Sequence, residues 1–464
     1  LSLVLALVMT MSLVTVSAGA KDFGDSADLS GEAYEEAVNV MSEMGIIDGY
    51  SDGDFRPQGT LTRGAAAKII ACMMLGKTTA EALGTQAAPF KDVPAGSTFA
   101  GYIAYCVESG LIDGYADGTF RPQNTLTGFA FLKMLLTALG YDSSIEGYTG
   151  TNWTVNVAGR ATQIGLTDGN DEFVGTRAAT REEACLYAVN ALQTTLVEYE
   201  SKGTNVTVNG ATVAIGASKP TFVTSSIAGA ATSIDDTLDN TTHDYTVEFA
   251  ERYQPDLELD HDIDVFGRPS HTWAWNGKDI GTYFDYDKLI ETYTTAITGK
   301  DLYDLLGKGT IEDEDYDIDV YVDGETASAV LGSAYFSDKN MIKTNTETVG
   351  ETGNGVLTEV FMDTDAKEIS VVVINTYLAI AEDDYDEKRD EVTFEVWGID
   401  ETSTKDAYVK DTDEKEVMPA VSGEDFDIED VVDGDIVRVT VADGEIQTID
   451  DVEALEDVTI TRFT

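Results

Sequence analysis

Residues 257–267, LELDHDIDVFG, hold the residue types that most readily do chemistry. His261 lies there among three aspartates, Asp260, Asp262 and Asp264. Imidazole and carboxylate groups together can bind a metal ion or transfer protons. Alternation along an extended chain, however, puts the three aspartates on one face and His261 on the other. That pattern is typical of an ordinary strand with a polar face, and we expect no metal or catalytic centre here.

Other stretches supply no catalytic constellation. The chain has only three histidines, and no Gly-x-Ser-x-Gly, His-Glu-x-x-His or phosphate-loop pattern stands out. The paired carboxylates of a glycosidase would lie far apart in a sequence with acidic residues throughout, so an enzyme acting on glycans stays an alternative. Our main expectation is a protein that is not an enzyme.

The composition excludes some partners. Eighty-five acidic residues against 29 basic ones give the 464-residue chain a formal charge of −56, which repels nucleic acid and anionic bilayers. Ca²⁺ prefers oxygen ligands and is the plausible bound ion, although solubility alone also explains such a charge. Three cysteines, too few for a disulfide framework, fall in apolar helical patterns, and we expect them in the core: Cys72, Cys106 and Cys185.

The N-terminal residues predict a secreted protein. An apolar run over residues 3–16 is followed by Ala18-Gly19-Ala20, which is typical of a signal peptide over residues 1–20. This run is too short to span a bilayer, and no later segment approaches a membrane span. We therefore expect an extracellular protein that is held at a cell without a membrane span in this sequence.

Two segments repeat without a gap. Residues 46–63 read IIDGYSDGDFRPQGTLTR and residues 111–128 read LIDGYADGTFRPQNTLTG, and Asp48 and Asp113 set the offset at 65 residues. Apolar stripes at helical spacing precede and follow each loop. Glycine then ends the first helix and threonine caps the second, which predicts a helix-loop-helix unit.

A third copy of this unit is degenerate. Residues 152–192 keep Trp153, an Asp-Gly turn and a second apolar helix, but they lack the Phe-Arg-Pro of the other loops. One two-helix unit has too little surface to bury its own apolar stripe, whereas three units can share a core. The repeats therefore predict one all-helical N-terminal bundle.

Together these features resemble the S-layer homology domain of bacterial cell-surface proteins. The resemblance covers about residues 22–196 and rests on Phe-x-Asp before the first two repeats, the Asp-Gly-Tyr to Phe-Arg-Pro loops, and Thr-Arg opening second helices. It implies a pseudo-three-fold bundle that binds secondary cell-wall polymer, often pyruvylated, in grooves between the repeats. The expected repeats are residues 22–77, 89–141 and 148–196.

The resemblance also points to carbohydrate-binding residues. Arg63 and Arg181 stand at the arginine of the family's Thr-Arg-Ala-Glu motif, where a guanidinium beside free backbone N–H groups suits a ketal carboxylate. Trp153 stands at the helix-one aromatic, which can stack on a pyranose ring. The remaining expected ligands are Asp25, Gly49, Asp92 and Gly114.

Departures from the motif leave alternatives open. Gly128 replaces the arginine in the second repeat, and Ala33 and Ala65 replace the helix-one aromatic and the motif glutamate in the first, so only one or two grooves are expected to work. Thr180-x-x-Glu183 also fits a capping box, in which Arg181 would merely face solvent. Each motif residue can thus be ligand or scaffold. We expect Arg56 and Arg121 to be structural and to bind loop carbonyls.

After residue 196 the apolar period changes from 3.6 to 2, which predicts β-structure. Asn209-Gly210 and Asp443-Gly444 predict hairpins over residues 206–215 and 437–449. Further strands are expected over residues 369–381 and 391–399, and a helix is expected over residues 286–306. We expect acidic sandwich-like or small-barrel modules over residues 201–360 and 361–464, and hence a multidomain α+β chain.

These observations predict a secreted bacterial cell-surface protein anchored non-covalently to secondary cell-wall polysaccharide. The β-rich part would then be structural, as an S-layer or surface-array component that can self-assemble. The alternative is an enzyme or adhesin, carried by the same anchor, that acts on or binds glycans. The sequence ends without a recognisable stop signal, so a longer parent is compatible with it.

Overall fold

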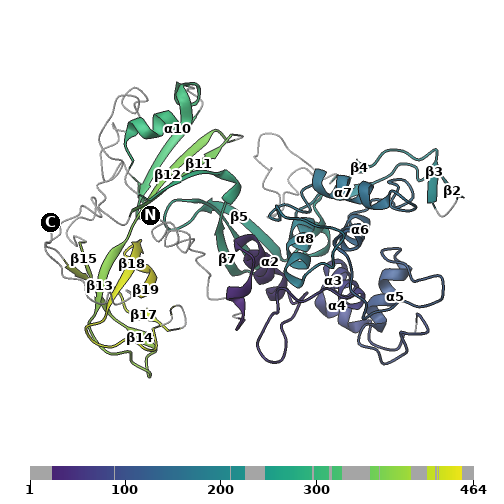
Figure 1. The fold of residues 1–464 in the computed structure, drawn as a ribbon, viewed down its shortest axis with the longest axis horizontal. Helices are drawn as coiled ribbons and strands as arrows, with labels where there is room; N and C mark the ends of the chain where they lie inside the picture. Colours follow the sequence, from purple (N-terminus) through teal and green to yellow (C-terminus); the bar gives the residue numbers. More distant parts are fainter. Residues whose placement is uncertain are drawn as a thin grey trace. The chain divides into compact units, whose positions relative to one another are not determined.

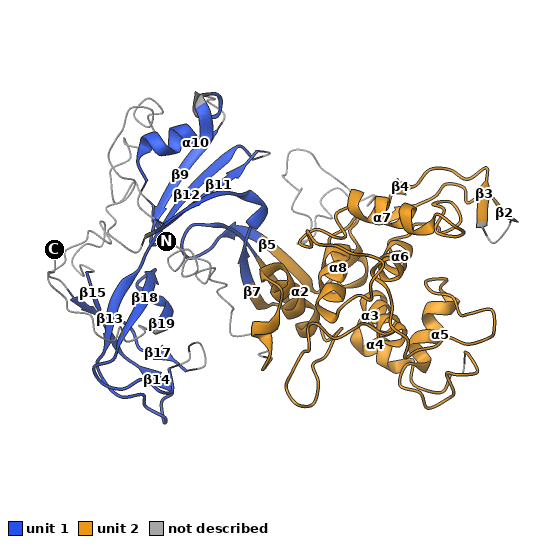
Figure 2. Ribbon diagram, in the orientation of Figure 1, with its two compact units in different colours: residues 1–18, 261–271, 282–464 blue, residues 19–260, 272–281 orange. Residues whose placement is uncertain are grey.

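The computed structural model describes residues 23–87, 89–208, 211–224, 246–294, 297–312, 316–326, 356–364, 366–398, 415–423, 426 and 428–451. The predicted signal peptide lies outside these residues. The chain divides into two compact units (Figure 2). Unit 2 contains Gly19–Asp260 and Thr272–Gly281; unit 1 contains Leu1–Ala18, His261–His271 and Thr282–Thr464. The expected mixed α+β class, helical first and β-rich later, is confirmed.

Unit 2 is built mainly from helices (Figure 1). Its helices are η1 (Ser26–Asp28), α2 (Glu32–Glu43), α3 (Arg63–Leu75), α4 (Lys77–Ala82), α5 (Ala100–Glu108), α6 (Gly128–Ala138), α7 (Trp153–Gln163), α8 (Arg181–Leu192) and α9 (Phe249–Tyr253). The pairs α2/α3, α5/α6 and α7/α8 are the three predicted helix-loop-helix repeats. Within the described residues, no helix is long and apolar enough to cross a membrane.

Local capping fixes where the second helix of each repeat begins. The Thr62 and Thr127 hydroxyls accept hydrogen bonds from the backbone N–H groups three residues on, as predicted. Thr180 and Glu183 form the predicted capping box at the start of α8. The three cysteines are buried core residues, also as predicted.

Isolated β-bridges link the three repeats in a ring. Each bridge joins the capping residue of one repeat to the residue two positions before the cap in another. The bridges are Thr62 to Thr125, Thr127 to Ala178 and Thr180 to Thr60. In the same order, α3 packs on α5, α6 on α7, and α8 on α2. The apolar stripes of the second helices are consequently buried between repeats, with Ile70, Leu135 and Cys185 fully buried.

Unit 2 extends beyond the repeats. The strands β1 (Val197–Glu198) and β4 (Thr221–Phe222) pair with each other, and β2 (Thr204–Val208) and β3 (Ala211–Ile215) form the predicted hairpin. The Gln254 amide donates to the Cys72 and Met73 carbonyls near the end of α3, at 3.0 and 2.6 Å. Trp273 is fully buried, and its indole N–H donates to Glu36 on α2 at 2.7 Å.

A three-stranded sheet follows in the order β5 (Leu257–Ile263), β6 (Pro269–Trp275) and β7 (Lys278–Phe284). On β5, residues 260–263 are all exposed, His261 and Ile263 included, so the predicted division into a polar and an apolar face does not hold at this end of the strand. Asp264 differs from the prediction: it lies beyond the strand end, is buried, and pairs with buried Arg268 at 2.5 Å. No three described His, Cys, Asp or Glu side chains gather closely enough to hold a metal ion.

Unit 1 contains two five-stranded sheets. The first has the order β10-β9-β12-β11-β8 and the second the order β16-β15-β13-β18-β19, while β14 and β17 pair separately. The strands are β8 (Leu289–Tyr293), β9 (Asp317–Val322), β10 (Glu325–Thr326), β11 (Val356–Asp363), β12 (Glu368–Asn375), β13 (Tyr377–Ala381), β14 (Glu391–Val392), β15 (Phe394–Trp397), β16 (Lys415–Val417), β17 (Val421–Ser422), β18 (Ile436–Ala442) and β19 (Glu445–Asp451).

The predicted strands within residues 369–381, 391–399 and 437–449 are confirmed, but the helix over 286–306 is wrong in its first half. Residues Tyr286–Lys288 form a short 3-10 helix (η2), and Leu289 to Tyr293 form β8, which pairs with β11. Helix α10 spans Gly299–Glu312. Apolar residues in a short segment fit both periods, and strand pairing decided this one.

Asp323 is a fully buried carboxyl group just after β9. Its carboxylate accepts hydrogen bonds from the N–H and side-chain amide of Asn375, both at 2.7 Å, and from the Tyr377 hydroxyl at 2.6 Å. Burial, which these bonds only partly offset, raises its pKa to about 7. The folded state therefore holds a proton that the unfolded state releases near pH 4.

We expect the stability of unit 1 to fall as pH rises from about 4 to about 7, and Asp323→Asn to flatten this dependence. Denaturant unfolding at several pH values, followed by the fluorescence of Trp397 in unit 1, measures how the free energy of unfolding changes with pH. Equal slopes in the two proteins would contradict a proton held at Asp323.

Candidate carbohydrate-binding grooves

Arg63, the first residue of α3, binds the loop of the second repeat. Its Nε donates to the Phe120 carbonyl and its Nη2 to the Asp113 carbonyl, both at 2.9 Å. The guanidinium also lies over the rings of Phe120 and Tyr115, 4.5 and 4.9 Å from their centroids. Arg63 therefore joins two repeats and closes one wall of a groove between them.

Arg181, the first residue of α8, does the same for the loop of the first repeat. It donates to the Phe55 carbonyl at 2.8 Å and to the Asp48 carbonyl at 2.9 Å, and its guanidinium lies over Phe55 and Tyr50. The capping box of α8 is present, but the alternative in which Arg181 merely faces solvent is wrong.

The second repeat has no equivalent arginine, and aromatic packing takes its place. A Cβ on Gly128 would lie 3.2 Å from Gly175 and from the Phe173 ring. The next residue, Phe129, packs edge to face on Phe173 with centroids 5.6 Å apart. The third repeat-to-repeat junction is thus apolar where the other two are cationic, as the Gly128 departure predicts.

Asp25 and Asp92 organise the loops of their own repeats. The Asp92 carboxylate accepts the N–H groups of Phe120 and Arg121, both at 2.8 Å, and Asp25 binds the first loop in the same way. These contacts hold Arg121 at a φ of 59°, a left-handed conformation that is uncommon for a residue with a side chain. Neither aspartate lines the two grooves described below, and a role in polymer binding stays a prediction for both.

Arg56 and Arg121 bind carboxylates, not loop carbonyls as predicted. Arg56 pairs with Asp52 at 2.5 Å and Arg121 with Asp117 at 3.0 Å. The prediction missed the acidic residue four positions earlier, which offers a guanidinium a stronger partner than a carbonyl does.

Gly49 and Gly114 allow aromatic rings to approach the loop backbone. A Cβ at Gly114 would lie 2.0 Å from the Phe90 ring, and one at Gly49 would lie 2.5 Å from the Phe23 ring. Both glycines are thus packing positions in the structure. Their contact with a polymer stays a prediction.

We expect Gly114→Ala to destabilise unit 2 by about 1–3 kcal/mol, because the Phe90 ring must move. Gly159→Ala is the matched control, since nothing lies within 4 Å of a Cβ there and alanine favours a helix. Denaturant unfolding monitored by circular dichroism compares the two. An unchanged unfolding midpoint for Gly114→Ala would show that the Phe90 ring moves aside without a loss of stability.

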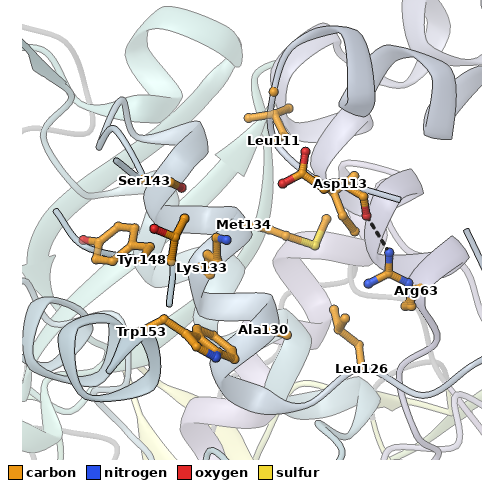
Figure 3. A pocket seen from close by; sticks show the side chains of 13 residues that line it. Arg63, Leu111, Asp113, Leu126, Ala130, Lys133, Met134, Ser143, Tyr148 and Trp153 are labelled. Carbon is orange, nitrogen blue, oxygen red and sulfur yellow. Dashed lines mark hydrogen bonds between the residues drawn. The ribbon is translucent and has the colours of Figure 1, made fainter. Parts of the chain in front are cut away.

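The Arg63 groove is a cavity of about 330 Å³ beside α6 (Figure 3). Trp153 and Lys133 line one side of it, and Arg63 and Asp113 line the other. The structure thereby brings together two predicted ligands, Arg63 and Trp153, that are 90 residues apart in sequence (153 − 63). The full lining is Arg63, Gly110, Leu111, Ile112, Asp113, Leu126, Ala130, Lys133, Met134, Ser143, Tyr148, Thr149 and Trp153.

The Arg181 groove, of about 320 Å³, is the corresponding cavity beside α3. Phe99 takes the place of Trp153, and Lys68 takes the place of Lys133. The lining comprises Ile46, Ile47, Asp48, Tyr50, Thr60, Leu61, Thr62, Ala65, Lys68, Ile69, Phe99, Gln123 and Arg181.

Among the described residues, the lysine of one groove is paired with a carboxylate, and the lysine of the other is not. Lys68 pairs with the Asp48 carboxylate at 2.9 Å, and Lys77 approaches the same carboxylate at 3.5 Å. Although burial acts in the opposite direction, Asp48 raises the pKa of Lys68. Lys133 makes no ion pair within the described part of the chain, and burial lowers its pKa. Its ammonium lies 6.0 Å from the Trp153 ring centroid.

Sequence reasoning missed the lysines, although a signal was present. Lys68 and Lys133 recur at the same offset of 65 residues (133 − 68), and after the opening residue each is the only charged residue of its helix. A lysine at the same position of a largely buried helix in two repeats indicates a role other than core packing.

Comparison with known proteins agrees with the predicted resemblance. The family model of the S-layer homology domain matches residues 23–67 and 89–132, and thus the first two repeats. The chain is 26% identical over 209 residues to a surface layer protein of Brevibacillus choshinensis, covering 44% of this chain and 18% of that protein. It is 26% identical over 172 residues to a middle cell wall protein of Brevibacillus brevis, covering 37% and 16%.

A third relative is a cellulosome-anchoring protein of Acetivibrio thermocellus, 36% identical over 101 residues, with 22% of each protein covered. The chain therefore spans less than a quarter of the length of these relatives. Residues 23–67 and 89–132 match the S-layer homology domain, and these relatives are surface layer, cell wall and cellulosome-anchoring proteins by name.

Proposed function

We propose that the repeats anchor this protein non-covalently to an anionic secondary polymer of a bacterial cell wall. The observation that carries the proposal is the Arg63 groove, in which a guanidinium, an ammonium and an indole face one cavity. Cationic groups in a partly desolvated site favour a carboxylate or phosphate, and an indole face favours the ring of a sugar. The anchoring function in the printed name of the Acetivibrio relative agrees with this proposal.

The finer proposal concerns the ligand and the number of working grooves. A pyruvyl ketal supplies one carboxylate per sugar, which suits the Arg63 and Lys133 pair. The Arg181 groove is weaker for an anion, because Asp48 already holds Lys68. The third junction has Gly128 at the position of the helix-opening arginine. The ring of bridges among Thr62, Thr127 and Thr180 supports a pseudo-three-fold bundle.

For the β-rich part we propose a structural role without catalysis, in a surface array that can self-assemble. The surface layer relative supports this role by its name. The expected sandwich or small-barrel modules stay predictions.

The experiment that tests the anchor is co-sedimentation of the full chain with purified cell walls, before and after the non-peptidoglycan polymer is stripped by acid. We expect sedimentation with intact walls and loss of binding after stripping. Equal binding to stripped walls would place the receptor in peptidoglycan and overturn the proposal, as would a folded protein that stays in the supernatant with every wall tested.

A further inference from the structure

The Arg63 groove has a side that the Arg181 groove lacks. Residues 141–150, here called the wall segment, follow α6 and contribute Ser143, Tyr148 and Thr149 to its lining. At the same offset of 65 residues, the first repeat has residues 76–85, which include α4, and none of them lines the Arg181 groove. The wall segment also lies outside residues 89–132, which match the family model.

The wall segment presents the Ser143 hydroxyl on the Lys133 side of the groove. Figure 3 shows Ser143 and Tyr148 on the same side of the cavity as Lys133. Ser143 is partly exposed, and its hydroxyl makes no hydrogen bond with the residues that the structure describes. It is therefore available to a ligand with donors and acceptors of its own.

The hairpin β2–β3 braces the wall segment from outside the groove. The Thr149 hydroxyl donates to the Thr212 carbonyl at 3.2 Å and accepts the Thr212 N–H at 3.0 Å. Beside it, the Ser144 hydroxyl bonds to the Asn205 side chain at 3.0 Å. A residue that lines the groove thus takes its position from a hairpin more than 60 residues away in sequence.

The orientation of the hairpin supports this role. The hairpin contacts the wall segment through the Asn205 side chain and the Thr212 backbone, whereas Val213 and Ile215 are 58% and 62% exposed. A two-stranded sheet is only marginally stable by itself. The apolar face of this one is exposed and adds little stability. Polar contacts tie it to the wall segment.

A second brace comes from Tyr199, just before the hairpin. Its hydroxyl donates to Glu146 at 2.8 Å and accepts the Asp142 N–H at 3.3 Å, while Arg160 of α7 pairs with Glu146 at 2.9 Å. Both ends of the wall segment are therefore tied to residues outside the loop.

We propose that the wall segment forms a second sugar subsite in the Arg63 groove, and that the β2–β3 hairpin positions it. The proposal rests on the proposed function, in which Arg63 and Lys133 take the anionic sugar. Ser143 then contacts the neighbouring, hydroxyl-bearing ring of the same polymer, and Thr149 acts as a positioning residue. The groove thereby selects an oligosaccharide over a single sugar.

Calorimetric titration of the full chain tests this proposal with two probes: the methyl glycoside of one pyruvylated hexosamine, and purified pyruvylated wall-polymer fragments of two repeat units. We expect Ser143→Ala and Thr149→Val to weaken binding of the fragments about fivefold, the size of one hydrogen bond, and to leave the single sugar unaffected. Thr149→Ser should restore binding because it keeps the hydroxyl. Val213→Thr, on the opposite face of the hairpin, is the control and should behave as the wild type.

The outcomes separate the two proposals. Unchanged binding of the fragments, or an equal loss on both probes, would overturn the second subsite and leave the anchor intact. A wild-type chain that binds neither probe would overturn the proposed function and the subsite with it.

Discussion

Replacement of Arg63 with alanine is expected to lower the affinity of the full chain for pyruvylated wall polymer by about 10- to 100-fold, the range of one hydrogen bond to a charged group. The guanidinium lines the groove and also holds the loop of the second repeat through the Phe120 and Asp113 carbonyls. Its removal therefore takes away a cation and loosens the opposite wall. Calorimetric titration with purified polymer measures the loss.

Arg181→Ala is the matched control, because Arg181 makes the same pair of carbonyl contacts in the other groove. We expect it to lower the affinity less than about threefold, since Asp48 already neutralises that groove. Circular dichroism verifies that both variants are folded, and Arg63→Lys, which keeps the charge, should bind better than Arg63→Ala. Equal losses for Arg63→Ala and Arg181→Ala would contradict the assignment of the Arg63 groove as the principal site.

Replacement of Trp273 with alanine is expected to destabilise unit 2 by about 3–5 kcal/mol, as removal of a fully buried large aromatic side chain does. Trp273 is 0% exposed and donates its indole N–H to Glu36 on α2, the first helix of the first repeat. The anchor should therefore lose stability through a substitution more than 75 residues beyond its last repeat. Denaturant unfolding followed by the helical signal measures the effect.

Two further variants separate packing from the hydrogen bond. Trp273→Phe keeps most of the apolar volume and should lose about 1–3 kcal/mol, whereas Trp275→Ala changes a partly exposed neighbour on the same strand and should lose less. If Trp273→Ala unfolds at the wild-type denaturant concentration, Trp273 contributes no more to unit 2 than a surface residue.

Much of the repeat architecture could be predicted because its signals are local. Thr62 and Thr127 cap helices through hydrogen bonds to residues three positions further on. The apolar stripes show which helix faces are buried. The β2–β3 pairing likewise joins strands that are near neighbours in the sequence. Such features depend on spacing alone and are visible in one sequence.

The composition of the grooves could not be predicted in the same way. Arg181 binds carbonyls 126 and 133 residues away, and only the ring of repeats tells which loop it meets. Asp25 was expected to be a ligand, and a sequence does not show that backbone N–H groups occupy its carboxylate.

The segment after the repeats gave no sequence signal for its role in the anchor. Thr212 and Tyr199 lie beyond the family resemblance, and their partners are loop residues without a repeated pattern. Because these contacts belong to unit 2, which continues to Asp260 and includes Thr272–Gly281, the full chain is the right material for binding studies. A fragment that ends at the third repeat would lack the brace of the Arg63 groove.

The most direct test of the anchor is a calorimetric titration of the full chain with purified wall polymer, before and after mild acid removes its pyruvyl ketals, using wild type, Lys133→Gln and Lys68→Gln. We predict that wild type and Lys68→Gln bind the intact polymer and lose most affinity when the ketal is removed. Lys133→Gln should bind both polymers weakly. Equal affinity of the wild type for the two polymers would contradict an anionic ligand in the Arg63 groove.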